Sequence, residues 1–431
     1  MELSKVEIVN YRSIANISIS PTPTCQGFVG INESGKTNIL TAISLLSPDV
    51  KLDKNDARIE GTNEDRQQNA YIMYSFVFSK EEMEKIIDGL LSSIYHESEL
   101  PKIEFSTKKQ SIANFFAAQN RGIYYCDIDA ETKNARYFEL HDSEIVPIPW
   151  LKKKSSKATS ASINSNTGKT IALQKYSFVE AGCIEAKNEV LFEDCTTADL
   201  NDVFGIFLGR HIEESIPNVV FWKYDDKYLL PNKIRLDSFR DNPSVCIPLK
   251  SMFHLAGYNK ITDLLISVKD RRANALTNIL KKVSEKSTEY LHKVWYSYKN
   301  VRFELRANGD DIDIHIQDSE NFYDCAQRSD GFKRFVTFLL VLSARVKNGE
   351  IRNSIILIDE PDLGIHILGQ KSLVQELIKI SKSNLVFYST HSIFMIDKKE
   401  PSRHFIVSKK NEITTIKQAT ESNYTDDEVL Y

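Results

Sequence analysis

The segment Gly30–Thr37, which reads Gly-Ile-Asn-Glu-Ser-Gly-Lys-Thr, constrains the fold more than any other part of the chain. It fits the pattern G-x-x-x-x-G-K-[ST], in which backbone N–H groups wrap a polyphosphate and the glycines permit its close approach. A short apolar run, Gly27–Val29, precedes it, and Asn38–Leu46 has helical spacing. A match by chance would not be expected to have this strand–loop–helix context. The sequence therefore predicts a nucleotide-binding loop.

The positions of this loop have separate expected roles. Lys36 would reach the β- and γ-phosphates, and the Thr37 hydroxyl would bind Mg²⁺. A nucleotide and Mg²⁺ are thus the expected cofactors, and the resemblance given below implies that the nucleotide is ATP. The remaining candidate contacts to the nucleotide are the other loop positions and the residue after them: Gly30, Asn32, Glu33, Ser34, Gly35 and Asn38.

A pair of carboxylates follows the apolar run Ile355–Ile358. Asp359 would orient Mg²⁺, and Glu360 would polarise the attacking water as general base. An acidic turn that merely closes a buried strand has the same pattern. The phosphate loop in the same chain favours the catalytic interpretation.

His391 lies in the polar segment Tyr388–Ser392, after the next predicted strand, Asn384–Tyr388. Ligands of α/β sheets bind at the carboxyl ends of the strands, so a histidine there suits a sensor of the γ-phosphate. A single histidine is more often structural. Its place in the order of the motifs favours the catalytic role.

The segment Gln327–Arg334 contains Ser329 and Gly331 ahead of a predicted helix, Phe332–Lys347. The serine hydroxyl and the backbone N–H groups could donate to a phosphate, helped by the helix dipole. Ser329 could equally be the N-cap of that helix. Both roles are compatible.

Taken in order, these four motifs resemble the head of ABC-type ATPases, in the branch that includes structural-maintenance-of-chromosomes proteins, RecF and the OLD-family ATPases. Asn10–Ile14, "NYRSI", resembles the N-terminal "NFR" element of the branch, which would place Arg12 near the phosphates. "RSDGFKRF" resembles the OLD-like signature, and "DEPDLGIHI" and "STHSIFMID" resemble two further runs of these heads. Ile365 and Ile393 depart from the pattern. The resemblance covers about residues 1–80 and 300–400.

The resemblance implies how such a chain works. The signature of one subunit completes the ATP site of another, so a homo-dimer or higher homo-oligomer and slow ATP turnover are expected. OLD-family proteins usually continue into a Toprim nuclease domain, whereas only forty residues follow His391. A separate Toprim-type nuclease is therefore the expected effector partner. The arrangement is similar to that of the AriA-like ATPases of the PARIS antiphage system.

The expected fold is an α/β ABC-type ATPase head, with a mixed sheet and flanking helices assembled from both chain ends. Residues 1–80 would form its N-terminal lobe, 81–300 an inserted helical or mixed arm with the dimerisation region, and 301–431 its C-terminal lobe. Val301–Gln317 is predicted to be a hairpin, turning at Asn308-Gly309 in a type I′ turn. A helical arm or bundle is expected from Ile261 to Tyr298.

Composition supports a globular, cytoplasmic protein. The chain has 431 residues, a formal charge of −4 and 42% hydrophobic residues, and it has no apolar run long enough for a membrane span. No membrane partner is expected. The pairs Asp127/Asp129 and Asp311/Asp313 are interpreted as turn and solvent-facing residues, and no nuclease is expected in this chain.

The alternative function is a recombination or repair ATPase that clamps duplex DNA directly. The near balance of charge does not indicate DNA binding, but it does not exclude a local basic patch. The candidate contacts, which could equally be solvated, are Lys152–Lys154, Lys157, Lys269, Arg271, Arg272, Lys281 and Lys282.

Overall fold

The structure is a computed structural model, and it describes most of the chain. The described residues are 1–59, 69–95, 121–136, 148–154, 162–164, 170–172, 176–178, 192–195, 209, 211–269, 274–296 and 298–420. The chain divides into two compact units. The first comprises Met1–Glu7, Leu52–Lys54 and Tyr71–Ile216, and the second comprises Ile8–Lys51, Asn55–Ala70 and Pro217–Tyr431.

The second unit is built on a sheet that joins the two ends of the sequence. Its strands lie in the order β12 (Val219–Lys223), β17 (Ile355–Asp359), β18 (Leu385–Thr390), β3 (Cys25–Val29), β19 (His404–Lys410), β20 (Ile413–Gln418) and β2 (Ile14–Ile19). The strands from β12 to β19 are parallel, and β20 is antiparallel to β19. Because β3 lies between β18 and β19, the predicted mixed α/β sheet assembled from both chain ends is confirmed.

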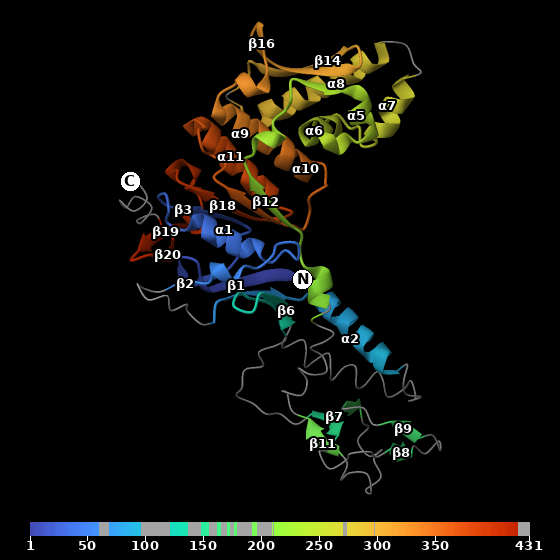
Figure 1. The fold of residues 1–431 in the computed structure, drawn as a ribbon, viewed down its shortest axis with the longest axis vertical. Helices are drawn as coiled ribbons and strands as arrows, with labels where there is room; N and C mark the ends of the chain where they lie inside the picture. The colour runs from blue at the N-terminus through green and yellow to red at the C-terminus, as the bar shows by residue number, and fades with distance from the viewer. Residues whose placement is uncertain are drawn as a thin grey trace. The chain divides into compact units, whose positions relative to one another are not determined.

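Helices cover both faces of this sheet, which is why its central strands are buried and mostly apolar. Every residue of β3 and of β17 is buried. The strands lie between α1 (Lys36–Ser44) on one side and α9 (Asp330–Phe338), α10 (Ala344–Lys347) and α11 (Ile367–Ile380) on the other (Figure 1). The parallel strands β3, β17 and β18 therefore end at one edge, where the phosphate loop and the carboxylate and histidine segments follow them.

The second unit also contains a helical bundle and an antiparallel sheet. The bundle consists of α5 (Leu236–Asp241), α6 (Ile247–Leu255), α7 (Ile261–Lys269) and α8 (Asn274–Val294). The sheet has the order β13 (Lys233–Arg235), β15 (Asp311–Asp318) and β14 (Val301–Asn308), with β16 (Asn321–Tyr323) paired to β15. The prediction of helices between Ile261 and Tyr298 is confirmed.

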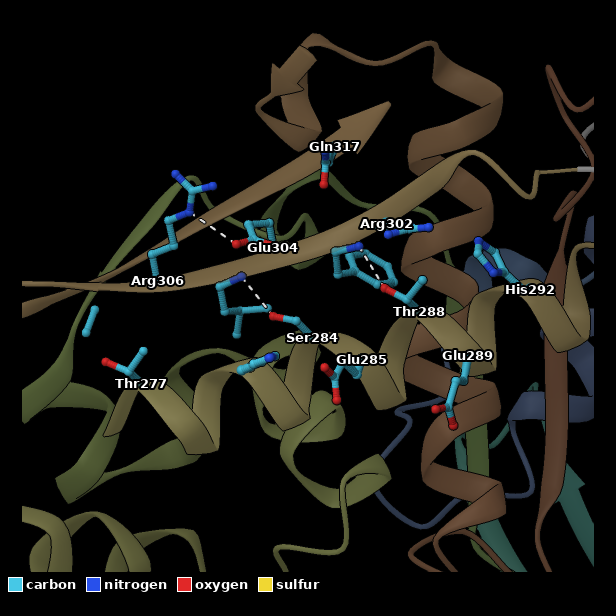
Figure 2. A pocket seen from close by; sticks show the side chains of 14 residues that line it. Thr277, Ser284, Glu285, Thr288, Glu289, His292, Arg302, Glu304, Arg306 and Gln317 are labelled. Carbon is cyan, nitrogen blue, oxygen red and sulfur yellow. Dashed lines mark hydrogen bonds and ion pairs between the residues drawn. The ribbon is translucent and has the colours of Figure 1, made fainter. Parts of the chain in front are cut away.

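Helix α8 lies along the outer edge of β14, and Figure 2 shows the contact. The Ser284 hydroxyl accepts the N–H of Leu305 at 2.9 Å, and the Thr288 hydroxyl accepts the N–H of Phe303 at 2.9 Å. These hydroxyls are four residues apart and so lie on one face of the helix. They satisfy backbone groups that an edge strand would otherwise leave open for pairing.

The first unit holds the remaining strands. An antiparallel set consists of β4 (Tyr71–Val77), β5 (Arg121–Asp127) and β6 (Thr132–Arg136), and α2 spans Lys80–Tyr95. Strand β1 (Glu2–Tyr11) begins in this unit and ends in the other. The smaller sheets have the orders β10 (Tyr176–Phe178), β7 (Ile148–Lys154), β11 (Phe192–Cys195), and β8 (Ser162–Asn164), β9 (Thr170–Ala172).

Two local predictions need correction. The hairpin forms, but its two-residue loop is Gly309–Asp310, because Asn308 still pairs with Asp311. Only Gly309 of the two has a positive φ, 59°, as expected where glycine takes the first central position of a type II′ turn. The Ser-, Thr-, Asn- and Lys-rich composition of residues 152–169 also predicts an exposed loop, which is wrong in part, because Lys152–Lys154 end strand β7 and Ser162–Asn164 form β8.

The helix predicted over Phe332–Lys347 is interrupted by a π-helical turn, Leu339–Ser343. This turn brings the Ser343 hydroxyl to 2.6 Å from the buried carboxylate of Glu376 and to 2.5 Å from the Tyr290 hydroxyl. Periodicity could not predict the turn, because all five of its residues are buried and a single wide turn leaves the apolar pattern intact.

The aspartate pairs are placed as predicted. Asp127 ends β5 and accepts the N–H of Ala130 in the following turn at 3.0 Å, and Asp311 pairs with Lys233 at 2.9 Å on the face opposite the buried isoleucines of β15. Among the described residues, no helix is long and apolar enough to cross a membrane. Three of the candidate DNA contacts, Lys157, Arg271 and Arg272, lie outside the described residues.

Candidate nucleotide-binding site

The phosphate loop connects β3 to α1, and its sharp path depends on two glycines. Gly35 has a φ of 105° and immediately precedes α1, so the backbone N–H groups that begin the helix are directed toward the loop. A Cβ atom on Gly30 would lie 2.2 Å from the carbonyl oxygen of Val407. Ile31, Asn32 and Glu33 are exposed at the tip. The backbone N–H groups at the start of α1 therefore lie at the loop, where the sequence predicts that phosphates bind.

Lys36 is folded back onto this loop. Its Nζ atom donates to the carbonyl oxygens of Gly30 at 3.0 Å and Ile31 at 2.7 Å. Burial lowers the pKa of Lys36 to about 8, against the opposing effect of nearby carboxylates, first among them Glu360. The ammonium is thus held in a partly desolvated position, within reach of a phosphate that replaces the carbonyl contacts.

Asp359 ends β17 beside the start of α1. Its carboxylate accepts the Thr37 hydroxyl at 3.1 Å and the Ser389 hydroxyl at 2.7 Å. The Lys223 ammonium lies 3.4 Å from its other oxygen. The structure therefore brings together the two residues predicted to hold Mg²⁺.

Glu360 and His391 form a direct pair. The Nε2 atom of His391 lies 2.6 Å from Oε1 of Glu360, so this nitrogen donates to the carboxylate. On the other side of the ring, Nδ1 lies 3.0 Å from the Gly30 carbonyl oxygen and 3.2 Å from Nζ of Lys36. His391 thereby connects the predicted base to the phosphate loop. We call Lys36, Thr37, Asp359, Glu360 and His391 the phosphate cluster.

The backbone at Glu360 is strained, with a φ of 48°. A non-glycine residue in this region costs about 1 kcal/mol or more and needs support from its surroundings. That support includes Ser389, whose hydroxyl accepts the Glu360 N–H at 2.9 Å while it donates to Asp359. One serine thus fixes both carboxylate residues.

Asp362 is a further carboxyl group close to the cluster. It is 5% exposed, and in the described part of the chain its Oδ1 atom has no hydrogen-bond partner. Burial raises the pKa of Asp362 to about 6, against the effect of a hydrogen bond from Thr390. This group is therefore poised to change its charge in the physiological pH range.

The residues Arg328–Gly331, here called the signature turn, lie at the start of α9. The exposed Ser329 is the N-cap, and its hydroxyl accepts the N–H of Phe332 at 3.4 Å. Gly331 is buried against the following segment, because a Cβ atom on it would lie 2.1 Å from the Gly364 carbonyl oxygen. Among the described residues, no hydrogen bond joins Ser329 or Gly331 to the phosphate cluster. The structure thus brings together the five residues of the phosphate cluster, but it does not join Ser329 or Gly331 to them by hydrogen bonds.

Arg12 and Asn38 lie beside the phosphate loop, near the start of α1. The Arg12 guanidinium pairs with Asp56 at 2.9 Å and contacts the Asn38 side chain at 3.4 Å. Asn38 in turn donates to the Ser13 hydroxyl at 2.8 Å. Both predicted residues therefore lie near α1, with Arg12 engaged by a carboxylate.

Thr414 of β20 supports the phosphate loop through a hydrogen bond to its backbone. Its hydroxyl donates to the Ser34 carbonyl oxygen at 2.9 Å and lies 2.7 Å from the Ser13 hydroxyl. A Cβ atom on Gly35 would lie 2.1 Å from this same hydroxyl oxygen. Glycine at position 35 therefore permits both the left-handed backbone conformation and the close contact with Thr414 of β20.

The donor set at Thr37 and Asp359 fits Mg²⁺. Both supply hard oxygen ligands, and Mg²⁺ characteristically keeps several waters and binds through one or two protein oxygens together with substrate phosphates. Among the described residues, no group of three or more His, Cys, Asp or Glu side chains could hold a metal by itself. The phosphates of a bound nucleotide would thus complete the coordination.

The fold and the cluster define a P-loop nucleotide-binding protein. The AAA ATPase domain family (AAA_15) matches residues 1–396. Because this match spans most of the chain, the protein belongs to the AAA ATPase domain family. ATP binding and hydrolysis is therefore its general activity.

A curated relative and three solved structures are also similar. The uncharacterized protein MJECL43 of Methanocaldococcus jannaschii is 26% identical over 137 residues, which cover 30% of this chain and 35% of that protein. An Smc head bound to the C-winged helix domain of ScpA matches with a TM-score of 0.47 at 12% identity, covering 98% of this chain and 99% of that one. With TM-scores below 0.5, such likenesses do not define what the chain does.

The other two structures match less well. An Smc head with an extended coiled coil, bound to the C-terminal domain of ScpA from Pyrococcus furiosus, has a TM-score of 0.44 at 12% identity and covers 96% of this chain and 95% of that one. The SMC head domain from Thermotoga maritima has a TM-score of 0.41 at 12% identity, covering 97% and 100%.

Sequence reasoning missed four residues of this region. Ser389 stands in the polar strand end already noted, and Asp362 lies in the "DEPDLGIHI" run, so both had a signal. Lys223 ends a run of β-branched and aromatic residues, Val219–Trp222, which is a strand signal. For Thr414 no local pattern indicated contact with a loop 380 positions earlier.

Proposed function

We propose that this protein is an ABC-type ATPase whose sites are completed between two copies of the chain. The observation that carries the proposal is the phosphate cluster, in which Thr37 contacts Asp359 and His391 connects Glu360 to Lys36. The cluster supplies a phosphate-binding lysine, oxygen ligands for Mg²⁺ and a glutamate base. P-loop ATPases use groups of these three kinds to bind and hydrolyse a nucleoside triphosphate.

The expected sequence of events begins with Lys36. An incoming triphosphate competes with the Gly30 and Ile31 carbonyl groups for its ammonium, and the N–H groups at the start of α1 bind the same phosphates. Bound Mg²⁺ would neutralise phosphate charge. Glu360 would then accept a proton from the attacking water through the oxygen that does not face His391.

The signature turn supports the second half of the proposal. Ser329 is exposed, and among the described residues its hydroxyl makes one long hydrogen bond, to its own helix, so this hydroxyl and the N–H groups at the start of α9 remain available to a phosphate from another copy. ATP would then favour the closed dimer, because the γ-phosphate is contacted from both sides only when it is present. Turnover would be slow, since each cycle requires assembly and separation.

A mixing experiment tests the composite site. Lys36→Ala removes the phosphate lysine, and Ser329→Arg places a bulky cation in the signature turn. Each variant alone should show little ATP hydrolysis. An equal mixture should recover about a quarter of wild-type turnover, because half of randomly formed dimers are mixed and each contains one intact site.

The controls separate assembly from folding. Ser329→Arg should bind a fluorescent ATP analogue as tightly as the wild type, whereas Lys36→Ala should not bind it. If the mixture recovers no activity although Ser329→Arg is folded and binds nucleotide, sites that form between copies are disproved.

We further propose that the ATPase acts in the cytoplasm as sensor and scaffold for a separate effector, a Toprim-type nuclease in antiphage defence. The support is the similarity of "RSDGFKRF" at the signature turn to the OLD-like form. Affinity purification from the native host, with and without ATP, tests this. Co-purification of a nuclease that depends on ATP supports the proposal, and a purified assembly without any nuclease contradicts it.

The alternative, a DNA clamp, finds less support. Lys281 lines a groove of about 750 Å³ between α8 and β14. Figure 2 shows Glu285, Glu289 and Glu304 in the same groove, with Arg302 and Arg306. Acidic side chains among the basic ones weaken attraction to a phosphate backbone. A steep loss of DNA affinity between low and high salt would be needed to favour the clamp.

A further inference from the structure

The carboxylate of Asp359 has a cation beside it in the structure. The side chain is 4% exposed, and a buried carboxylate is costly unless it is paired or accepts hydrogen bonds. Thr37 and Ser389 supply neutral hydroxyl donors. The ammonium of Lys223, 3.4 Å from Oδ2, supplies the charge.

The position of Lys223 follows from the sheet. Strand β12 is parallel to β17, and its last residue, Lys223, is in register with Asp359. Residues in register on parallel neighbours direct their side chains to the same face. Trp222 points to the opposite face, where it packs edge-on against Phe338 with ring centroids 5.9 Å apart. The ion pair is therefore a consequence of strand register.

The Lys223 ammonium can nevertheless move away from the Asp359 carboxylate. Its side chain is 73% exposed, so its charge can return to water at little cost. Asp359 cannot move in the same way, because it is buried and held by two hydroxyl groups. The pair thus combines a fixed anion with a displaceable cation, which is the arrangement expected of a temporary counter-ion.

We infer that the Lys223 ammonium is the counter-ion of the Asp359 carboxylate when no metal is bound, and that Mg²⁺ displaces this ammonium when it binds. The inference rests on the proposed role of Asp359 as a metal-holding residue. A divalent cation that approaches Asp359 alone must displace the ammonium, so its affinity is lowered. A cation that arrives with nucleotide phosphates brings further oxygen ligands, which offset this competition. Lys223 therefore disfavours metal binding without nucleotide and couples the two ligands.

The test compares Lys223→Gln with Lys227→Gln. Lys227 is an exposed lysine of the same segment that pairs with Asp225 at 2.8 Å and does not contact Asp359. Free Mn²⁺ is followed by electron paramagnetic resonance without nucleotide. We expect Lys223→Gln to bind Mn²⁺ roughly two- to fivefold more tightly than the wild type, the range expected for the loss of one exposed ion pair. Lys227→Gln and Lys223→Arg should match the wild type.

A second measurement is the Mg²⁺ concentration that gives half-maximal binding of a fluorescent ATP analogue. It should fall in Lys223→Gln and stay constant in Lys227→Gln. An unchanged value overturns the inference, and a raised value overturns it in favour of a direct contact between Lys223 and the phosphates. Wild-type nucleotide binding that needs no divalent cation is a different failure, because it removes the metal role of Asp359 itself.

Discussion

The phosphate cluster and the signature turn each include polar residues at the start of a helix, Thr37 in α1 and Ser329 at α9, yet their groups are satisfied differently. In the cluster, Lys36, Asp359, Glu360 and His391 contact one another or the loop at 2.6–3.2 Å. In the signature turn, the Ser329 hydroxyl is exposed and has one long contact, to its own helix. The polar groups of the phosphate cluster are thus satisfied within one chain, whereas the Ser329 hydroxyl of the signature turn is exposed to solvent.

This difference indicates how the free energy of ATP binding is divided. A ligand of the cluster must replace existing hydrogen bonds, so part of its interaction energy is offset. A ligand of the signature turn replaces mainly water. The phosphate cluster is therefore suited to discriminating between ligands. The signature turn is suited to binding the nucleotide that the cluster of another copy already holds.

The comparison is tested most strongly by Glu360→Gln. Glutamine can keep the hydrogen bond from His391 but cannot accept a proton, so ATP turnover should fall by about two orders of magnitude or more. Nucleotide binding should change little, and the protein should accumulate as a closed dimer or larger assembly, measured by light scattering after gel filtration. The exposed Glu285→Gln is the control, and hydrolysis at the wild-type rate would show that Glu360 is not the base.

A smaller effect is expected from Gly331→Ala in the signature turn. The added methyl group would meet the Gly364 carbonyl oxygen at 2.1 Å, so the turn or the 364 segment must shift. Turnover should fall roughly tenfold, the scale of a small displacement at a composite site, while binding of the ATP analogue remains. Gly309→Asn, in a hairpin loop with open space around it, should leave both unchanged. A loss of nucleotide binding in Gly331→Ala would break the distinction between cluster and turn.

The smallest effect concerns Asp362 and pH. Because its pKa is raised from 3.8 to about 6, the folded protein holds this proton more tightly than the unfolded chain. Its contribution to stability is full below pH 3.8 and is lost as pH rises through about 6, a change of at most about 3 kcal/mol. Asp362→Asn should therefore raise the thermal midpoint relative to wild type at pH 7.5 but not at pH 4.

Thermal unfolding followed by intrinsic fluorescence between pH 4 and 7.5 measures this difference. The exposed Asp49→Asn should follow the wild type at every pH. If Asp362→Asn shows the same pH dependence as wild type, the buried carboxyl group is not the source of the effect.

Much of this arrangement could be predicted because it is local in sequence. The phosphate loop, the Asp359–Glu360 pair and His391 each follow a short apolar strand, so their alignment at one edge follows from a parallel sheet. The contacts of Lys223 and Thr414 could not be predicted in this way. They depend on which strands lie at the edge or beside the loop, and strand order is decided by packing over the whole chain.

The signature turn shows the same limit. Sequence alone identified Ser329 as both N-cap and phosphate donor, and the structure describes the N-cap. The contact between Gly331 and Gly364 had no signal, because it joins two backbones and no side-chain pattern marks such a contact. The π-helical turn at Leu339–Ser343 was missed for a related reason, since its residues are apolar or small throughout.

The bond from Thr414 to the Ser34 carbonyl oxygen also has a consequence for biosynthesis. The ribosome makes Ser34 of the phosphate loop 380 residues before Thr414 of the strand that supports it. At about 5–20 residues per second, the loop waits roughly 20 to 80 seconds for Thr414. A nascent chain therefore has the phosphate-binding motif long before it has the hydrogen bond by which β20 supports the loop.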